Sequence, residues 1–185
     1  MTLKLLNNIR YRIARRNLQQ EHLKLIRVRK PHSLESAQYA ALLYNLPDED
    51  TYKKIEEFIK SLNDLNIKVK VACYTDQKII PYYFIPKLLQ DIITSRDVNW
   101  YYHPVKPFVK DFLEEEFDML IDLSLREHFP LLFLAAKSKA ALKIGHFDEA
   151  HQDYYDLMID VPPDATLEYF IGQVMHYLTK INTES

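Results

Sequence analysis

The chain is poor in glycine. Glycine occurs only twice in 185 residues, at Gly145 and Gly172, whereas an average usage of about 7% would give roughly 13. Loops that cradle phosphate groups depend on glycine, because the main chain must approach the anion closely and often takes a positive φ. Neither a G-x-G-x-x-G run nor a G-x-x-x-x-G-K-[ST] run is present. We therefore expect no dinucleotide or P-loop nucleotide site of the usual kind, and no cofactor.

Cysteine and long apolar runs are scarce as well. Cys73 is the single cysteine, which excludes an internal disulfide and a thiolate cluster for zinc or iron–sulfur chemistry. It lies in the apolar run 69–74, where a small buried side chain is typical. No apolar run approaches the roughly 18 residues of a transmembrane helix. Basic residues interrupt the first segment throughout, so we also expect no secretory signal peptide.

Acidic side chains are almost missing from the start of the chain. Residues 1–30 hold nine basic side chains against one acid, Glu21, a formal charge of +8. The remaining residues hold 15 basic and 25 acidic side chains, a formal charge of −10. The total of −2 therefore conceals a basic arm attached to an acidic body.

The first twenty residues follow a helical period. At about 100° per residue, four apolar side chains gather on one arc, Leu5, Leu6, Ile9 and Ile13. The arginines lie mostly outside this arc, which excludes Arg10, Arg12 and Arg15 but has Arg16 on its apolar side. Such a basic amphipathic helix can lie on an anionic membrane surface, contact nucleic acid, or pack its apolar arc on its own domain. The sequence leaves these three alternatives open.

From residue 38 onwards, short apolar runs alternate with helical periods. We predict strands at 39–44, 67–75, 91–94, 119–123, 141–144 and 157–161. We predict helices over 52–62, 108–117 and 130–137, and a final amphipathic helix capped by Asp164 that carries apolar residues from 167 to 178. Pro81 and Pro86 break the stretch 76–90 into loop pieces.

This alternation is typical of βαβ units. We expect an α/β fold with an open, mainly parallel, doubly wound (Rossmann-like) sheet of five or six strands, preceded by the basic helix. Because connections are short and no linker divides the chain, we divide it into a basic helical arm, 1–30, and a single α/β domain, 31–185.

In a doubly wound sheet, ligands bind beyond the carboxyl ends of the strands where the strand order reverses. If the first and fourth strands are neighbours, the crevice there would be built from Asn45, Asp122, Ser124 and Arg126. A structural interpretation of the same residues is simpler. Ser124 and Glu127 form an S-x-x-E pattern that can cap the next helix, while Asp122 stays in solvent at the end of its strand.

No catalytic group is identifiable from the sequence. A Ser124–His128 nucleophile lacks a third member. A second polar cluster has metal-compatible side chains, His146, Asp148, Glu149, His151 and Asp153. Its H-x-x-x-x-H spacing suits neither a helix face nor a strand face, so a polar surface loop is the interpretation that we adopt, without a metal.

Aromatic residues concentrate in two places. Trp100 and Tyr101 lie in the segment 97–104, and Tyr82, Tyr83 and Phe84 lie shortly before it. Together they could form an aromatic patch at one end of the sheet that anchors a partner or stacks on a ligand. Burial beneath a long loop is the alternative.

Several runs are familiar as a set. They are 97–100, 117–125, 129–131, 135–140, 156–159 and 170–178. Together with the basic N-terminal helix, they resemble an uncharacterised family of small bacterial α/β proteins, a domain of unknown function. The resemblance implies a stand-alone cytoplasmic protein and transfers no functional residue.

Residues 117–145 alone are similar to part of the N-terminal half of heptosyltransferase-type glycosyltransferases. That fold needs a second Rossmann-like half for the nucleotide sugar, for which this chain is too short, and it needs glycines that this chain lacks. The similarity therefore implies sheet topology and not glycosyl transfer.

Our leading hypothesis is a non-catalytic binding or interaction module. It would engage a protein partner or an anionic membrane surface, rather than nucleic acid, through residues 1–30, and would then lie peripherally on the inner face of the membrane. The partner surface would comprise Arg10, Arg12, Arg15, Arg16, Trp100 and Tyr101. The alternative hypothesis is an enzyme or small-ligand sensor that uses the crevice near Asn45 and 122–126.

Overall fold

The computed structural model describes the main chain of residues 2–181 and the side chains of residues 6–181. The side chains of Lys4 and Leu5, and residues 182–185 of the expected domain, lie outside the described residues. The elements in chain order are α1 (Thr2–His22), β1 (Tyr39–Asn45), α2 (Glu49–Asp64), β2 (Lys68–Thr75), β3 (Gln90–Thr94), α3 (Phe108–Glu114), β4 (Met119–Asp122), α4 (Phe129–Lys137), β5 (Leu142–His146), the 3-10 helix η1 (Glu149–Tyr154), β6 (Leu157–Ile159) and α5 (Leu167–Leu178).

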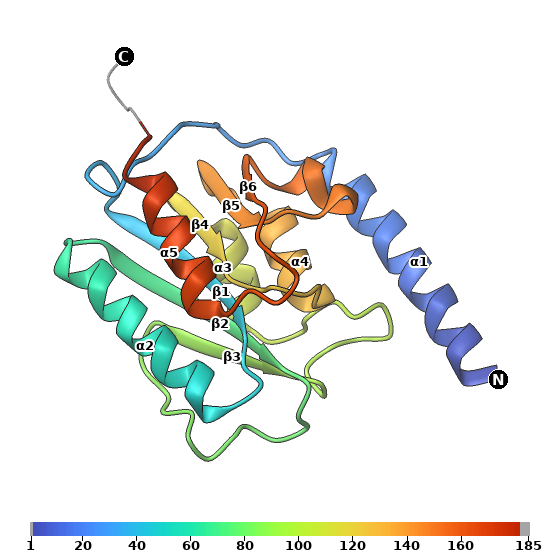
Figure 1. Cartoon of the computed structure of the whole chain (residues 1–185). Coiled ribbons are helices and arrows are strands. Elements are labelled where there is room, and N and C mark those ends of the chain that lie inside the picture. The colour runs from blue at the N-terminus through green and yellow to red at the C-terminus, as the bar shows by residue number, and fades with distance from the viewer. Residues whose placement is uncertain (1, 182–185) are drawn as a thin grey trace.

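The strands form one sheet in the order β3-β2-β1-β4-β5-β6 (Figure 1). Every neighbouring pair is parallel, with Leu42 of β1 between Val71 of β2 and Ile121 of β4. The α/β fold with a parallel, doubly wound sheet and an N-terminal helix is thus confirmed. The strand order reverses between β1 and β4, which places the switch point of the sheet there.

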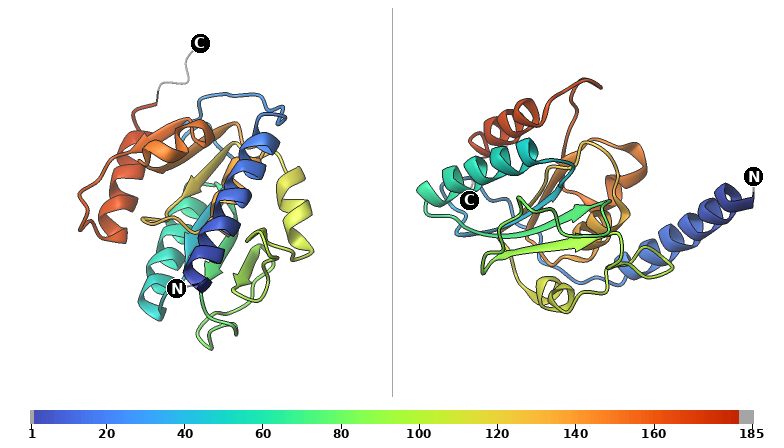
Figure 2. Two further views of the ribbon diagram at one scale, coloured as in Figure 1. Left: turned by 90° about the vertical axis from the view of Figure 1, so that its right-hand side faces the viewer. Right: turned by 90° about the horizontal axis from the view of Figure 1, so that it is seen from below.

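Helices cover both faces of the sheet, and each face has its own apolar core. α2 and α5 cover one face, where Ile55, Phe58, Phe170 and Val174 pack on alternate residues of the central strands. α1, α3 and α4 lie on the other face, with Leu18, Phe112 and Leu134 in its core. Figure 2 shows α2 and α5 together on one side, while the N-terminal half of α1 extends beyond the body. Both faces of the central strands are therefore sealed.

Local signals explain most element boundaries. α2 begins after Asp48, whose carboxylate accepts a hydrogen bond from Thr51 N at 2.8 Å. At its C-terminal end, Asn66 takes the left-handed conformation, φ 64°, that glycine usually supplies. Ile67 N then donates a hydrogen bond to Leu62 O at 3.0 Å, which closes the helix.

Two predicted helix boundaries shift for identifiable reasons, and β6 also ends earlier than predicted, at Ile159 rather than 161. α5 is capped by Thr166, not Asp164, since the chain first makes a turn in which Ala165 N donates to Pro162 O. α3 stops at Glu114, before the predicted end at 117. Glu115 leaves the helix because its carboxylate pairs with Lys70 and accepts a hydrogen bond from the Tyr39 hydroxyl.

The segment between α1 and β1 is tied to the body by charge. Arg27 donates to Ala140 O at 3.0 Å and pairs with Asp156 at 2.6 Å. Asp156 also accepts a hydrogen bond from Lys143 N at 2.9 Å. The Lys143 side chain is fully buried, and its Nζ donates to Ala136 O at 3.3 Å. Burial, with the nearby Arg27 charge, lowers the pKa of Lys143 to about 7.

The two glycines lie inside regular elements, and neither has a positive φ. Gly145 is in β5, where an added Cβ would lie 2.6 Å from Tyr155 Cε1. Gly172 is on an exposed position of α5, with nothing within 4 Å of such an atom. Glycine therefore serves packing at Gly145, and neither glycine forms a phosphate-binding turn.

This contrast predicts opposite effects on stability. We expect Gly145→Ala to destabilise the fold by about 1–3 kcal/mol, because the new methyl group would displace the Tyr155 ring. The matched control Gly172→Ala should stabilise it by roughly 0.5–1 kcal/mol, since alanine is the better helix former. Urea denaturation of both variants measures this. Equal effects in the two variants would contradict the assigned role of Gly145.

The buried Lys143 predicts that the stability of the fold depends on pH. Its folded pKa lies below that of the unfolded chain, so its contribution to stability is present above about pH 10.4 and is lost as the pH falls towards 7. We expect Lys143→Met to be the more stable protein near pH 7. Its advantage should shrink by at most about 1.4 kcal/mol per pH unit as the pH rises to about 10.

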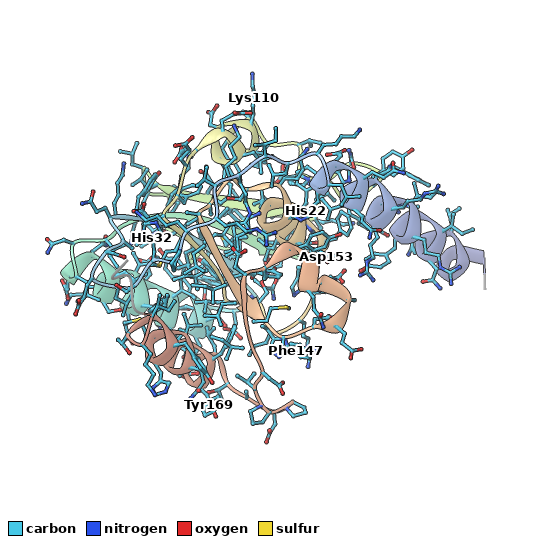
Figure 3. All side chains as sticks on the ribbon, turned by 90° about the horizontal axis from the view of Figure 1, so that it is seen from above. His22, His32, Lys110, Phe147, Asp153 and Tyr169 are labelled. Carbon is cyan, nitrogen blue, oxygen red and sulfur yellow. The ribbon has the colours of Figure 1, made fainter. Side chains whose placement is uncertain are left out.

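The measurement is the free energy of unfolding of both proteins across that range. Lys110→Met, on the exposed face of α3 (Figure 3), is the control because that side chain is in water whether the chain is folded or unfolded. A difference between wild type and Lys143→Met that does not change with pH would contradict the burial of a neutral lysine.

Candidate functional site

A pocket of about 280 Å³ lies at the switch point, beyond the carboxyl ends of β1 and β4. Asn45 ends β1, and Ser124 and Arg126 belong to the loop after β4; all three line the pocket. Tyr44, Leu123 and Leu167 supply apolar walls from β1, the β4 loop and the start of α5. The parallel order of the sheet therefore brings segments about 80 residues apart to one cavity.

A second, more polar pocket of about 110 Å³ lies on the other side of the same loop. Ser124, Leu125, Arg126 and His128 line both pockets, so the loop 124–128 stands between them. Asp122 lines the second pocket only. The four residues that the sequence assigned to a crevice, Asn45, Asp122, Ser124 and Arg126, are thus all placed around this loop, although they do not all face one cavity.

Three polar groups at the larger pocket have no partner in the described part of the chain. Asn45 Oδ1 and Ser124 Oγ are both shielded and without a hydrogen bond. Arg126 is exposed and, among residues 6–181, makes neither a hydrogen bond nor an ion pair with another side chain. Most shielded polar atoms in folded proteins are paired. The pocket therefore offers an acceptor, a hydroxyl and a guanidinium to whatever enters it.

Asp122 is buried, contrary to the expectation that it stays in solvent. Only 5% of the residue is exposed, and its carboxylate accepts hydrogen bonds from Tyr155 Oη at 2.7 Å and Ser124 N at 3.0 Å. Burial raises the pKa of Asp122, against the opposing effect of these two donors. Tyr155, which packs on Gly145, therefore holds this carboxyl group in place.

The predicted capping box of Ser124 and Glu127 does not form. The residue that caps α4 is His128, with no side-chain cap, and Pro130 follows in the first turn. Glu127 instead accepts a hydrogen bond from Tyr11 of α1 and lies 2.8 Å from His151 Nε2. Although its burial acts in the opposite direction, the bonds from His151 and Tyr11 lower the pKa of Glu127. An ionised Glu127 therefore connects α1, the loop and η1.

The loop after β1 differs from a phosphate-binding turn in one decisive respect. In dinucleotide-binding folds, the free N–H groups at the start of the first crossover helix receive the pyrophosphate. Here the Asp48 carboxylate takes the place of the pyrophosphate, because it accepts the hydrogen bond from Thr51 N. That hydrogen bond lowers the pKa of Asp48, so a negative charge already occupies this helix end.

One member of the second polar cluster, His151, is buried, whereas a polar surface loop would leave it exposed. His151 is 5% exposed and lies between Glu127 and Asp148, which caps η1 through Ala150 N. Asp153 and Glu149 face solvent elsewhere on η1. Within residues 2–181, no group of three or more His, Cys, Asp or Glu side chains is arranged to hold a metal ion.

α1 packs on the body, but with the face opposite to its predicted apolar arc. Ala14 and Leu18 are fully buried against α4. Polar contacts flank them: His22 Nδ1 lies 2.8 Å from Ala136 O, and Arg15 donates to Ala150 O at 2.8 Å. The small Ala14 permits close approach of the helices, which the sequence period does not reveal. Figure 1 shows α1 beside α4 and η1 at its C-terminal half.

The predicted apolar arc faces away from the body. Leu6, Ile9 and Ile13 are 50%, 45% and 38% exposed. They are spaced three and four residues apart and form one stripe along the helix. Arg12 and Arg16 are also exposed and flank this stripe. We call these five residues the outer face of α1.

Arg10, Trp100 and Tyr101 lie beside one another at the flank of α1. Arg10 Nε donates to Trp100 O at 2.9 Å, and its guanidinium lies 4.6 Å from the Tyr102 ring centroid. Trp100 and Tyr101 remain 46% and 38% exposed and touch edge to face. Together with α1 they make one continuous region of the surface.

The two aromatic runs, which the sequence allowed to form a single patch, do not do so. Tyr83 and Phe84 pack on Tyr52 of α2, on the opposite face of the sheet from Tyr102. Tyr82 is 91% exposed on that side. The two aromatic runs are close in sequence, but β3 separates them.

Sequence reasoning missed Tyr11 and Tyr155, which position Glu127 and Asp122. Each tyrosine contacts an acid that is more than 30 residues away, so no local pattern signals the pairs. The proximity of Tyr155 to Gly145 would have been the one usable hint, because a glycine within a strand often marks a close approach.

The chain belongs to a family of unknown function, DUF6913, whose family model matches residues 10–181. The match covers all six strands, the helices that pack on them and the part of α1 that docks on the body. It begins at residue 10, after Leu6 and Ile9 of the outer face of α1. No curated protein and no solved structure matches the chain.

None of the helices among residues 2–181 is long and apolar enough to cross a membrane.

The Asp122–Tyr155 pair yields a prediction. In Tyr155→Phe the ring still packs on Gly145, but Asp122 loses one of its two donors. We expect the pKa of Asp122 to rise further, and the fold to lose about 1–3 kcal/mol near pH 7. Carbon-13 NMR titration of the carboxyl group and urea denaturation measure the two effects. Tyr82→Phe, at an exposed tyrosine, is the control; an unchanged Asp122 titration in Tyr155→Phe would contradict the assigned bond.

Proposed function

We propose that this protein is a non-catalytic interaction module that docks on an anionic membrane surface through the outer face of α1. The observation that carries the proposal is the orientation of α1. Its inner face is committed to α4, whereas Leu6, Ile9 and Ile13 are directed outwards. Exposed apolar side chains in a row, flanked by arginine, are the features of a helix that lies in the membrane interface.

Charge supports an anionic surface as the partner. Arg12 and Arg16 flank the apolar stripe, while Arg10 and Arg15 are engaged with the body. The body from residue 31 onwards is strongly acidic, so an anionic surface would repel the body and attract the arm. A membrane would thus meet the protein with α1 first.

The arrangement of the arginines favours lipid over nucleic acid. Phosphate tracking along a nucleic acid needs several free cations in a row. Two of the four arginines of α1 are instead used to hold the helix on the body, and the two that remain, Arg12 and Arg16, lie beside an exposed apolar stripe. Trp100 and Tyr101, beside the flank of α1, are residue types that favour the membrane interface.

The expected affinity is modest. Burying the exposed half of each of the three apolar side chains contributes roughly 1 kcal/mol per residue. Arg12 and Arg16 add about 1 kcal/mol each near an anionic surface. A total of about 5 kcal/mol describes reversible, salt-sensitive attachment, comparable to other single-signal membrane anchors.

Vesicle flotation tests the proposal. Wild-type protein should float with vesicles of phosphatidylcholine and phosphatidylserine at low salt, and less at high salt. It should not float with phosphatidylcholine alone. Two double variants, Ile9→Asp with Ile13→Asp and Arg12→Glu with Arg16→Glu, should each reduce the bound fraction about tenfold or more, since each removes about 2 kcal/mol.

The controls carry changes of the same kind at one position each, away from α1. Ile79→Asp is on an exposed part of the loop after β2, where the residue is 71% exposed, and Lys110→Glu is on α3 (Figure 3). Both should float like wild type. Absence of wild-type flotation, or an equal loss in the controls, would show that the outer face of α1 does not bind lipid.

A further inference from the structure

The larger pocket at the switch point is separate from the outer face of α1, and its lining residues indicate which kind of ligand it would bind. Its three unpaired polar groups, Asn45 Oδ1, Ser124 Oγ and the Arg126 guanidinium, come from two strands' ends and surround one cavity of about 280 Å³. Sites for drug-sized ligands measure about 300–1,000 Å³. A small metabolite is therefore the occupant that fits.

The pocket lining carries one free positive charge. Arg126 is free because its acidic neighbours are engaged: Asp122 with Tyr155 and Ser124 N, and Glu127 with Tyr11 and His151. His128 also lines the pocket, and burial lowers its pKa, so it is neutral near pH 7. One guanidinium without a second cation matches a singly charged carboxylate better than a phosphate dianion.

Asn45 adds a hydrogen-bond acceptor to the lining. Asn45 Oδ1 requires a donor, and no donor of the described chain reaches it. Pro47 and Thr51 also line the pocket, and between them in sequence lies the ionised Asp48, which makes the local potential negative. An ammonium or hydroxyl group would be stabilised here, whereas a second anionic group would be repelled.

The rest of the pocket wall is apolar. Tyr44 and Leu123 come from β1 and the β4 loop, and Leu167 comes from the first residue of α5. A ligand that fits all three features has a carboxylate, a hydrogen-bond donor group and an apolar side chain.

We propose that this pocket binds a small α-amino or α-hydroxy carboxylic acid with an apolar side chain. Arg126 receives the carboxylate, Asn45 accepts a hydrogen bond from the amino or hydroxyl group, and Ser124 Oγ bonds to either group. Tyr44, Leu123 and Leu167 contact the side chain.

NMR titration of the nitrogen-15-labelled full chain with leucine and with leucic acid tests this assignment. Either probe should shift the amides of residue 45 and of 123–128. Isocaproate lacks the donor group and isoamylamine lacks the carboxylate, so both should bind about tenfold or more weakly. Inorganic phosphate should leave these amides unchanged at the same concentration.

Two variants test which side chain binds which polar group of the ligand. Arg126→Gln should weaken leucine binding about 10- to 100-fold, because it removes the charge-assisted bonds. Asn45→Ala should weaken leucine binding about tenfold and leave that of isocaproate unchanged. Arg96→Gln, at an exposed arginine that lines neither pocket, is the matched control and should bind like wild type.

Three results would overturn the assignment. The first is that neither leucine nor leucic acid shifts these amides. The second is that phosphate shifts them as strongly. The third is that Arg126→Gln binds the acids as tightly as Arg96→Gln does. Because none of these measurements involves lipid, they are independent of the membrane proposal.

Discussion

The docking of α1 on α4 is the contact on which the rest of the surface depends. Ala14 and Leu18 bury one side of the helix completely, and the flanking bonds of Arg15 and His22 fix its rotation. A helix held in this way has no freedom to turn its other side inwards. The exposure of Leu6, Ile9 and Ile13 therefore follows from the packing of the inner face, and not from a lack of structure. The same docking carries Tyr11 to Glu127, so the position of α1 also helps to position the loop that separates the two pockets.

The carboxyl end of the sheet shows how a doubly wound fold can offer a site without glycine. Its two glycines lie in β5 and α5, and the helix after β1 is capped by the chain's own carboxylate at Asp48. The position that would receive a phosphate in a dinucleotide-binding fold already carries a negative charge. The unpaired cation lies instead after β4, at Arg126. The polarity of the crevice is thus reversed relative to that of a dinucleotide site, and our proposal of a carboxylate ligand at the β4 side rests on this reversal.

Much of the fold could be predicted from the sequence, because its strands are short apolar runs buried on both faces. The runs at β1, β2 and β4 show this pattern directly, and the parallel order follows from the helices between them. The candidate crevice could be located for the same reason, since strand ends are fixed once the order is known. The contacts within it could not be. Tyr155 donates a hydrogen bond to the buried Asp122, 33 residues away in sequence. Tyr11 donates one to Glu127, 116 residues away, and Glu127 therefore does not cap the helix. Periodicity likewise finds an apolar arc on α1 but cannot tell which face will pack, because the buried face has only Ala14 and Leu18 as fully buried apolar residues and otherwise relies on polar side chains.

Amide hydrogen exchange of α1 in the free protein tests the central claim most directly. A helix of this composition gains most of its stability from tertiary packing, so its protection reports docking. The amides of residues 14–22 should exchange as slowly as those of α4. Exchange of these amides at the rate of an unprotected peptide, while β1 and β4 stay protected, would show that α1 is detached and that its outer face has no fixed orientation.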